Sequence, residues 1–128
     1  MTLIRKMTHD VRGAAMVEFA LAVPVLILMI WGIFQVGIAF QASAGMQHAL
    51  GEGARYATIF PIPTDTQIQA KMSAKVFGTG IGTFSTPTVT SGTGYKDLSV
   101  TFTMTPNFLF FNAPPVTLTR NKRVYTAT

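Results

Sequence analysis

The sequence contains no cysteine and only five acidic residues among 128. The missing cysteines exclude disulfides, thiolate zinc sites and cysteine nucleophiles. The five carboxylates form no close pair, the two histidines (His9 and His48) lie far apart, and no P-loop, Gly-x-Ser-x-Gly or His-Glu-x-x-His pattern occurs. We therefore expect no enzyme activity: no catalytic residues, no metal, no cofactor and no small-molecule substrate.

The net charge of +5 is spread along the chain. Three basic residues precede the first apolar stretch, and the others are scattered apart from a group at Arg120, Lys122 and Arg123. Nucleic-acid-binding proteins usually concentrate Lys and Arg on one face or stripe. The charge distribution therefore predicts no nucleic-acid partner.

One long stretch lacks charge altogether, because residues 19–51 contain no Asp, Glu, Lys or Arg. Its most apolar part is FALAVPVLILMIWGIFQVGIAF, residues 19–40. About 20 apolar residues in a helix, at roughly 1.5 Å each, cross the hydrocarbon core of a bilayer. A buried helix of a soluble domain is the alternative, but residues 59–128 are too few to surround it. We expect a single membrane span in contact with lipid.

The flanking charges predict the orientation of this span. Arg5, Lys6 and Arg12 precede it, whereas only Arg55 follows within about 15–20 residues. The positive-inside rule then places the N-terminus in the cytoplasm and the C-terminus across the membrane. A cleavable secretory signal ending at Ala42-Ser43-Ala44 is a competing interpretation, but its apolar region would exceed the usual length of about 7–15 residues.

The start of the span carries the most informative pattern, RGAAMVEFALAVPVLILMIWGIFQVG from Arg12. A basic leader, a glycine, a glutamate five residues later and then an apolar helix resemble the type IV prepilin class. The resemblance implies a membrane aspartyl prepilin peptidase as partner and a cut between Gly13 and Ala14. Glu18 then becomes the fifth residue of the mature chain, and the aromatic Phe19 follows it.

The chemistry of Glu18 is consistent with that spacing. A carboxylate near the head of an apolar helix is costly in hydrocarbon, so it needs a partner. Cleavage creates an ammonium group at Ala14, and Glu18 of one subunit can meet that amine on its neighbour. The positive N-terminal end of a helix also favours the carboxylate. Gly-x-x-x-x-Glu alone is a weak pattern, but here it follows Arg12 and opens the apolar helix.

Two elements resemble the TadE-like family of type IVb (Tad) pilus pseudopilins. They are RGAAMVEFALAVP, residues 12–24, and GEGARYA, residues 51–57. The resemblance implies a minor pilin or pseudopilin of the bacterial inner membrane that acts in pilus assembly or initiation for surface adhesion. Its implied partners are other Tad pilins or pseudopilins and the pilus assembly platform. Some 70 residues follow the helix, which departs from the major Tad pilin and favours a minor component.

The helix is expected to continue beyond the membrane to about residue 58. Pro24 removes one backbone hydrogen bond and is expected to kink or loosen the helix. Met46 and Leu50 are candidates for an inner face, Glu52 and Arg55 for an i,i+3 pair, and His48 for a polar face. The helix is expected to break at residues 59–63, which include Pro61 and Pro63.

The remaining residues predict a short helix and a small antiparallel sheet. Thr64 and Gln67 have capping-box spacing, and Ile68, Met72 and Val76 form an apolar stripe in a helix ending at Gly78. Residues 98–105 alternate strictly between apolar and hydroxylated side chains and predict a strand. Further strands are expected at 88–90, 116–119 and 124–126, with 120–123 as a turn or exposed edge. For residues 108–111 we favour burial over an exposed patch.

The fold class expected is therefore α+β and pilin-like. It comprises a leader peptide (1–13), a transmembrane and assembly helix (14–58) and a small periplasmic α+β domain (59–128). Two other interpretations stay open. One is an uncleaved single-pass inner-membrane protein whose periplasmic domain binds a ligand or partner, and the other is a secreted β-rich domain.

Overall fold

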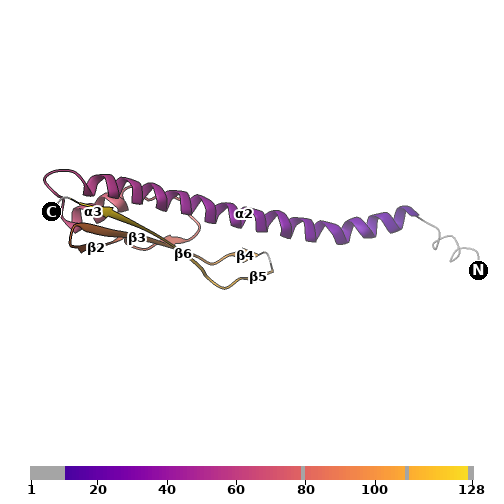
Figure 1. Cartoon of the computed structure of the whole chain (residues 1–128). Coiled ribbons are helices and arrows are strands. Elements are labelled where there is room, and N and C mark those ends of the chain that lie inside the picture. The colour runs from indigo at the N-terminus through magenta and orange to yellow at the C-terminus, as the bar shows by residue number, and fades with distance from the viewer. Residues whose placement is uncertain (1–10, 79, 109, 127–128) are drawn as a thin grey trace, which may run out of the picture. The chain divides into compact units, whose positions relative to one another are not determined.

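The computed structural model describes residues 11–78, 80–108 and 110–126 and confirms the α+β class (Figure 1). A long N-terminal helix is followed by a short helix and antiparallel strands. The elements are α2 (Val11–Ala57), α3 (Asp65–Ser73), β1 (Thr83–Phe84), β2 (Thr88–Gly92), β3 (Tyr95–Met104), β4 (Asn107–Phe108), β5 (Phe111–Asn112) and β6 (Val116–Tyr125).

The chain divides into two compact units between Phe34 and Gln35. In the first unit, the described residues form one stretch of α2, and most of its side chains are exposed. By length and composition alone, α2 is one helix that could cross a membrane, with a mean hydropathy of 2.3 in its most apolar window. Residues 19–34 include no polar face that could be turned to water while an apolar face packs on a soluble core.

The second unit, residues 35–128, is built around β3. Strand β6 pairs antiparallel with all of β3, from Tyr125 opposite Tyr95 to Val116 opposite Met104. On the other edge, β2 pairs with the first half of β3 and β1 with residues near its end. Gly94, with φ of 77°, completes the two-residue turn between β2 and β3, where a left-handed conformation favours glycine.

The alternation predicted for β3 is confirmed. Leu98, Val100, Phe102 and Met104 are buried, and the residues between them are half-buried. These side chains form one core with the second half of α2 and with Ile68 and Met72 of α3. Met46 and Leu50 of α2 belong to this core as expected, whereas His48 is exposed.

Helix α2 contributes a face of small residues to this core. Ala42, Ala49 and Ala57 are buried, and two glycines allow still closer approach. A Cβ on Gly45 would lie 1.8 Å from the backbone oxygen of Phe77, and one on Gly53 would lie 2.4 Å from Cγ of Met72. Side chains at these positions would therefore push the segment after α3, and α3 itself, away from α2.

Helix α3 begins as predicted and ends earlier than predicted. Thr64 caps it, with both hydrogen bonds of the capping box to Gln67 present. The helix ends at Ser73 rather than Gly78, although Val76 still packs against the core. The apolar spacing indicates which side chains face the core. It does not determine where the helical hydrogen bonds end, because a side chain can face the core from a residue beyond the helix.

The two short strands expected at residues 116–119 and 124–126 are one strand, β6, in the structure. It runs unbroken through residues 120–123, which are therefore an exposed edge and not a turn. These charged residues fit in a strand because they have partners: Arg123 pairs with Asp97, and Arg120 donates hydrogen bonds to Ser43 Oγ. Charges along an edge strand also oppose edge-to-edge aggregation.

The burial expected for residues 108–111 is not observed for Phe110 and Phe111. Strands β4 and β5 form a small hairpin of their own, and Phe110 and Phe111 are 76% and 59% exposed rather than buried. Leu109 lies outside the described residues. The core is already filled by β3, α2 and α3, so this aromatic segment finds no place in it. Strand β1 was also not predicted, since its two residues lie in a Gly- and Thr-rich loop sequence.

The close approach at Gly45 gives a first testable prediction. Gly45→Ala should lower the free energy of unfolding of the second unit by about 1–3 kcal/mol, because the new Cβ meets the Phe77 backbone. Gly51→Ala, in the same helix, is the matched control, since no atom lies within 4 Å of its Cβ. It should stabilise by about 0.5–1 kcal/mol.

Tryptic cleavage after the buried Lys96, measured across a urea series by mass spectrometry, reports this unfolding. Equal urea midpoints for the two variants would contradict the close-packing argument.

Candidate functional site

The residues of the predicted processing junction all lie near the start of α2. Gly13, Ala14, Glu18 and Phe19 are exposed, and a Cβ on Gly13 would meet no atom within 4 Å. The Gly13–Ala14 bond lies in α2, which is described from Val11 onward. A peptidase can reach this bond without disturbing a packed core.

The helical geometry places Ala14 and Glu18 on one face. Residues four apart are neighbours on a helix surface, and no acidic residue occupies the first turn of α2. After a cut before Ala14, Glu18 would lie one turn from the new terminus. The exposure of both residues leaves this face open to a neighbouring subunit.

Pro24 lies inside α2 and does not end it. The ring removes one backbone donor, and the helix nevertheless continues to Ala57. Membrane-type helices tolerate such positions. The kink expected at Pro24 stays a prediction.

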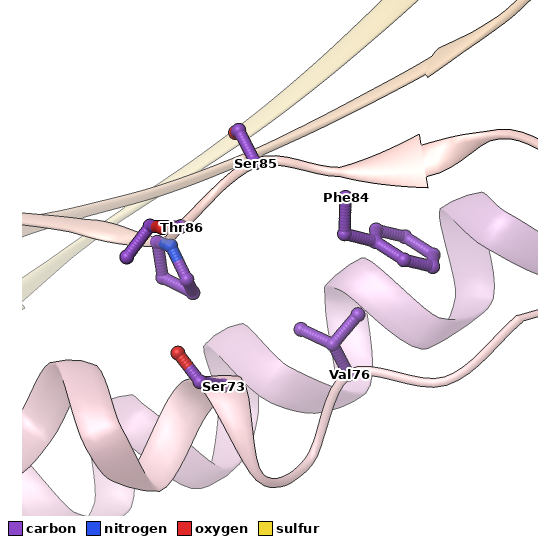
Figure 2. Close-up of a pocket in the computed structure, with 6 residues that line it drawn as sticks. Ser73, Val76, Phe84, Ser85 and Thr86 are labelled. Atoms are coloured by element: carbon purple, nitrogen blue, oxygen red, sulfur yellow. The ribbon is translucent and has the colours of Figure 1, made fainter.

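The second unit has a shallow groove of about 320 Å³ beside α3 and β1 (Figure 2). Val76 and Phe84 lie at one side of it, and Ser73 faces Thr86 across it (Figure 2). The side chains that line it are apolar or hydroxylated, without a charged or titratable acid–base group. This arrangement offers neither a general base nor a metal ligand set.

A polar cluster joins α3 to the β2–β3 hairpin. Lys96 is buried on the inner face of β3 and donates hydrogen bonds to Asp65 and to Ser91 Oγ, while Ser91 donates to both Asp65 oxygens, at 2.8 and 2.9 Å. The hydrogen bond from Lys96 holds the pKa of the Asp65 carboxyl below its ordinary value, against the opposing effect of partial burial. Since every member is satisfied within the cluster, we interpret it as structural.

A second ion pair lies on the outer face of the sheet. Arg123 binds Asp97 through two hydrogen bonds of 2.7 Å and covers the ring of Tyr95 at 4.2 Å. The bond from Arg123 lowers the pKa of Asp97, and the carboxylate in turn raises the pKa of Arg123. Within residues 11–78, 80–108 and 110–126, no three acidic or histidine side chains are grouped closely enough to hold a metal.

Sequence reasoning overlooked Gln35, a polar residue inside the apolar stretch 19–40. It is only 6% exposed, and its Nε2 donates a 3.0 Å hydrogen bond to the backbone oxygen of Asn107. A signal was present, because Gln35 is the one amide side chain in that stretch. Its partner lies 72 positions away and could not be inferred from spacing.

Taken together, an apolar helix of membrane-spanning length and a small α+β unit are the arrangement expected of a pilin-like protein. The family model described as TadE-like protein matches residues 13–55, about a third of the chain. The resemblance inferred from RGAAMVEFALAVP and GEGARYA is thereby confirmed: over residues 13–55 this chain is similar to TadE-like proteins. No curated protein and no solved structure is significantly similar to the chain.

The two lowered carboxyl pKa values predict acid sensitivity of the second unit. Unfolded Asp titrates near about 3.9. The contributions of Asp65 and Asp97 to stability are therefore present above about pH 4 and are lost as the pH falls through their lower folded-state pKa values.

Urea midpoints measured from pH 6 down to about pH 2 should fall at the acid end. Asp65→Asn should lower the midpoint at neutral pH, because it weakens the pairing of the buried Lys96, and should flatten the acid dependence. An unchanged acid dependence in this variant would contradict the role given to Asp65.

Proposed function

We propose that this chain is a minor pilin or pseudopilin of a Tad (type IVb) pilus. In this proposal it is inserted once in the bacterial inner membrane, with the N-terminus cytoplasmic and the C-terminal unit periplasmic. A prepilin peptidase removes residues 1–13, and the mature chain then acts with other pilins and the assembly platform to initiate or support the pilus.

The observation that carries the proposal is the junction at residues 12–19. A basic residue, Gly13 and Glu18 stand in the spacing of prepilin processing sites and open the apolar helix. The family match covers Gly13, Glu18 and most of the second TadE-like element. The exposure of the junction in α2 agrees with access by a membrane peptidase.

The exposed apolar surface of the first unit supports a role in assembly. Met16, Phe19 and Leu21 are each at least 70% exposed, and most large side chains up to Phe34 are also exposed. Exposed apolar area costs roughly 25 cal/mol per Å² in water, so this surface requires lipid or other apolar helices around it. A bilayer stores the helix, and a bundle of pilin helices can replace the lipid in a filament.

Glu18 makes such a bundle selective for chains that have been cleaved. Its carboxylate is unfavourable in an apolar bundle unless an opposite charge neutralises it. The ammonium of Ala14 on a neighbouring subunit provides that charge only after cleavage. Assembly is thereby restricted to processed chains.

Replacing Gly13 tests the processing step. Gly13→Leu should leave the precursor uncut when it is co-expressed with its prepilin peptidase, whereas the unaltered chain should yield a mature form that starts at Ala14. Gly37→Leu is the matched control, since both glycines lie in α2 with no atom within 4 Å of a Cβ. Mass spectrometry of the membrane fraction measures the N-terminus. Normal processing of Gly13→Leu, or an intact Met1 in the unaltered chain, would refute the proposal and favour the uncleaved membrane protein.

Replacing Glu18 tests the assembly step. Glu18→Gln keeps the size of the side chain and removes the charge that would meet the Ala14 amine, so cross-linking of the mature chain to partner pilins should fall strongly. Glu52→Gln, an acidic residue near the other end of α2, should cross-link as the unaltered chain does. Undiminished cross-linking in Glu18→Gln would argue against charge pairing at this position.

A further inference from the structure

The β4–β5 hairpin exposes an aromatic surface at one end of the second unit. Phe108 and Phe111 face each other across the hairpin with stacked rings 5.0 Å apart, and Phe110 at its tip is 76% exposed. Exposed aromatic side chains close together on a small unit are unfavourable in water and mark a contact surface.

A hydrogen bond joins the hairpin to α2 at the first residue of the second unit, within the apolar stretch. Gln35 is the first residue of the unit, and its Nε2 donates to the Asn107 backbone oxygen in β4. Val36 and Phe40, on the same part of α2, are 55% and 73% exposed. The aromatic hairpin and the apolar end of the helix therefore lie at the same end of the unit.

Counting along α2 gives the depth of this end in a bilayer. About 20 helical residues span the roughly 30 Å of hydrocarbon. A span that starts at Phe19, directly after the charge of Glu18, therefore ends near Ile38. Gln35 then lies about 5 Å inside the outer hydrocarbon boundary. The hairpin that binds its amide must reach the same level.

The backbone of the hairpin suits a lipid boundary. Unpaired peptide groups are costly in hydrocarbon, and part of those in this segment are paired, because β4 pairs with β5 and the Ala113 amide donates to the Pro106 oxygen. Pro114 and Pro115 follow, and neither has an amide hydrogen to desolvate. These features lower the cost of placing the hairpin at the lipid boundary.

The next contact along α2, between Ser43 and Arg120, suits the headgroup layer of a bilayer. Arg120 donates hydrogen bonds of 3.1 and 3.2 Å to Ser43 Oγ and is itself exposed. Ser43 is eight residues beyond Gln35, about 12 Å further from the membrane centre. That distance places the guanidinium among lipid phosphates, which Arg binds well. Aromatic residues at the hydrocarbon boundary with a cation outside them favour lipid over a second protein surface.

We propose that the β4–β5 hairpin is a membrane-contacting element. Phe110 and Phe111 insert into the outer boundary of the bilayer, and the hairpin shields the Gln35 amide from lipid. The proposal rests on the membrane span given under the proposed function but is independent of cleavage after Gly13. It assigns the second unit a contact with lipid besides its covalent link to the span.

Tryptophan fluorescence of the full chain tests this contact. In a Trp31→Phe background, Phe110→Trp places a reporter at the hairpin tip. Phe60→Trp is the matched control, because Phe60 is 91% exposed and lies in the loop after the other end of α2. Neither change removes a buried contact. Each chain is reconstituted into phosphatidylcholine–phosphatidylglycerol vesicles, with phosphatidylcholine brominated either near the carbonyl end or near the methyl end of its acyl chains.

Emission from the Trp at position 110 should be blue-shifted from that at position 60. It should lose most of its intensity with shallow bromines and less with deep ones, while the reporter at position 60 is unaffected. Emission as red and unquenched as at position 60 would overturn the proposal in favour of a solvated hairpin. A blue shift without quenching would also overturn it, in favour of cover by protein.

The native Trp31 distinguishes a failure of the hairpin contact from a failure of the membrane span. In the unaltered chain its emission should be quenched most by deep bromines, because Trp31 lies within the span. Quenching at Trp31 without quenching at position 110 overturns the hairpin contact alone. No quenching at Trp31 overturns the span itself, and with it both this inference and the membrane part of the proposed function.

Discussion

The close approach of backbones along the second half of α2 is the constraint on which the second unit depends. The Phe77 carbonyl occupies the space that a Cβ on Gly45 would need, and Met72 occupies that space at Gly53. Alanines at 42, 49 and 57 complete this face. Because the small residues on this face let α3 and the segment after it approach α2 closely, one sheet face and two helices suffice to enclose a core in a unit of this size.

The surroundings of helix α2 change along one continuous element. Up to Phe34 its apolar side chains are exposed and require lipid or other helices, whereas from Ile38 onward one face is buried in protein. Polar groups stand near both ends of the apolar stretch: Glu18 directly before it and Gln35 near its C-terminal end. Each is costly in hydrocarbon. The proposed Ala14 amine would pair with Glu18, and the Asn107 carbonyl accepts a hydrogen bond from Gln35 Nε2, whereas Gln35 Oε1 is buried without a hydrogen-bond partner among the described residues.

Local patterns predicted much of the fold because their causes are local. The capping box at Thr64, the alternation in β3 and the end of α2 near residue 58 follow from side-chain period, hydrogen bonds within four residues and proline chemistry. The prediction of burial was wrong for residues 110–111, and for residues 120–123 the sequence had left a turn and an exposed edge open. Their placement depends on partners distant in sequence, namely a core already filled by other elements, and Asp97 and Ser43 beside β6.

The sequence by itself determined the apolar helix, the spacing of Gly13 and Glu18 and the TadE-like resemblance, since these depend only on residue order and on helical rise. Only the tertiary structure decided that Arg120 and Arg123 belong to one strand, that Gly45 is a contact point and that the aromatic hairpin lies beside Gln35. These features join segments more than 25 residues apart. Such pairings arise from packing of the whole unit, and no local period encodes them.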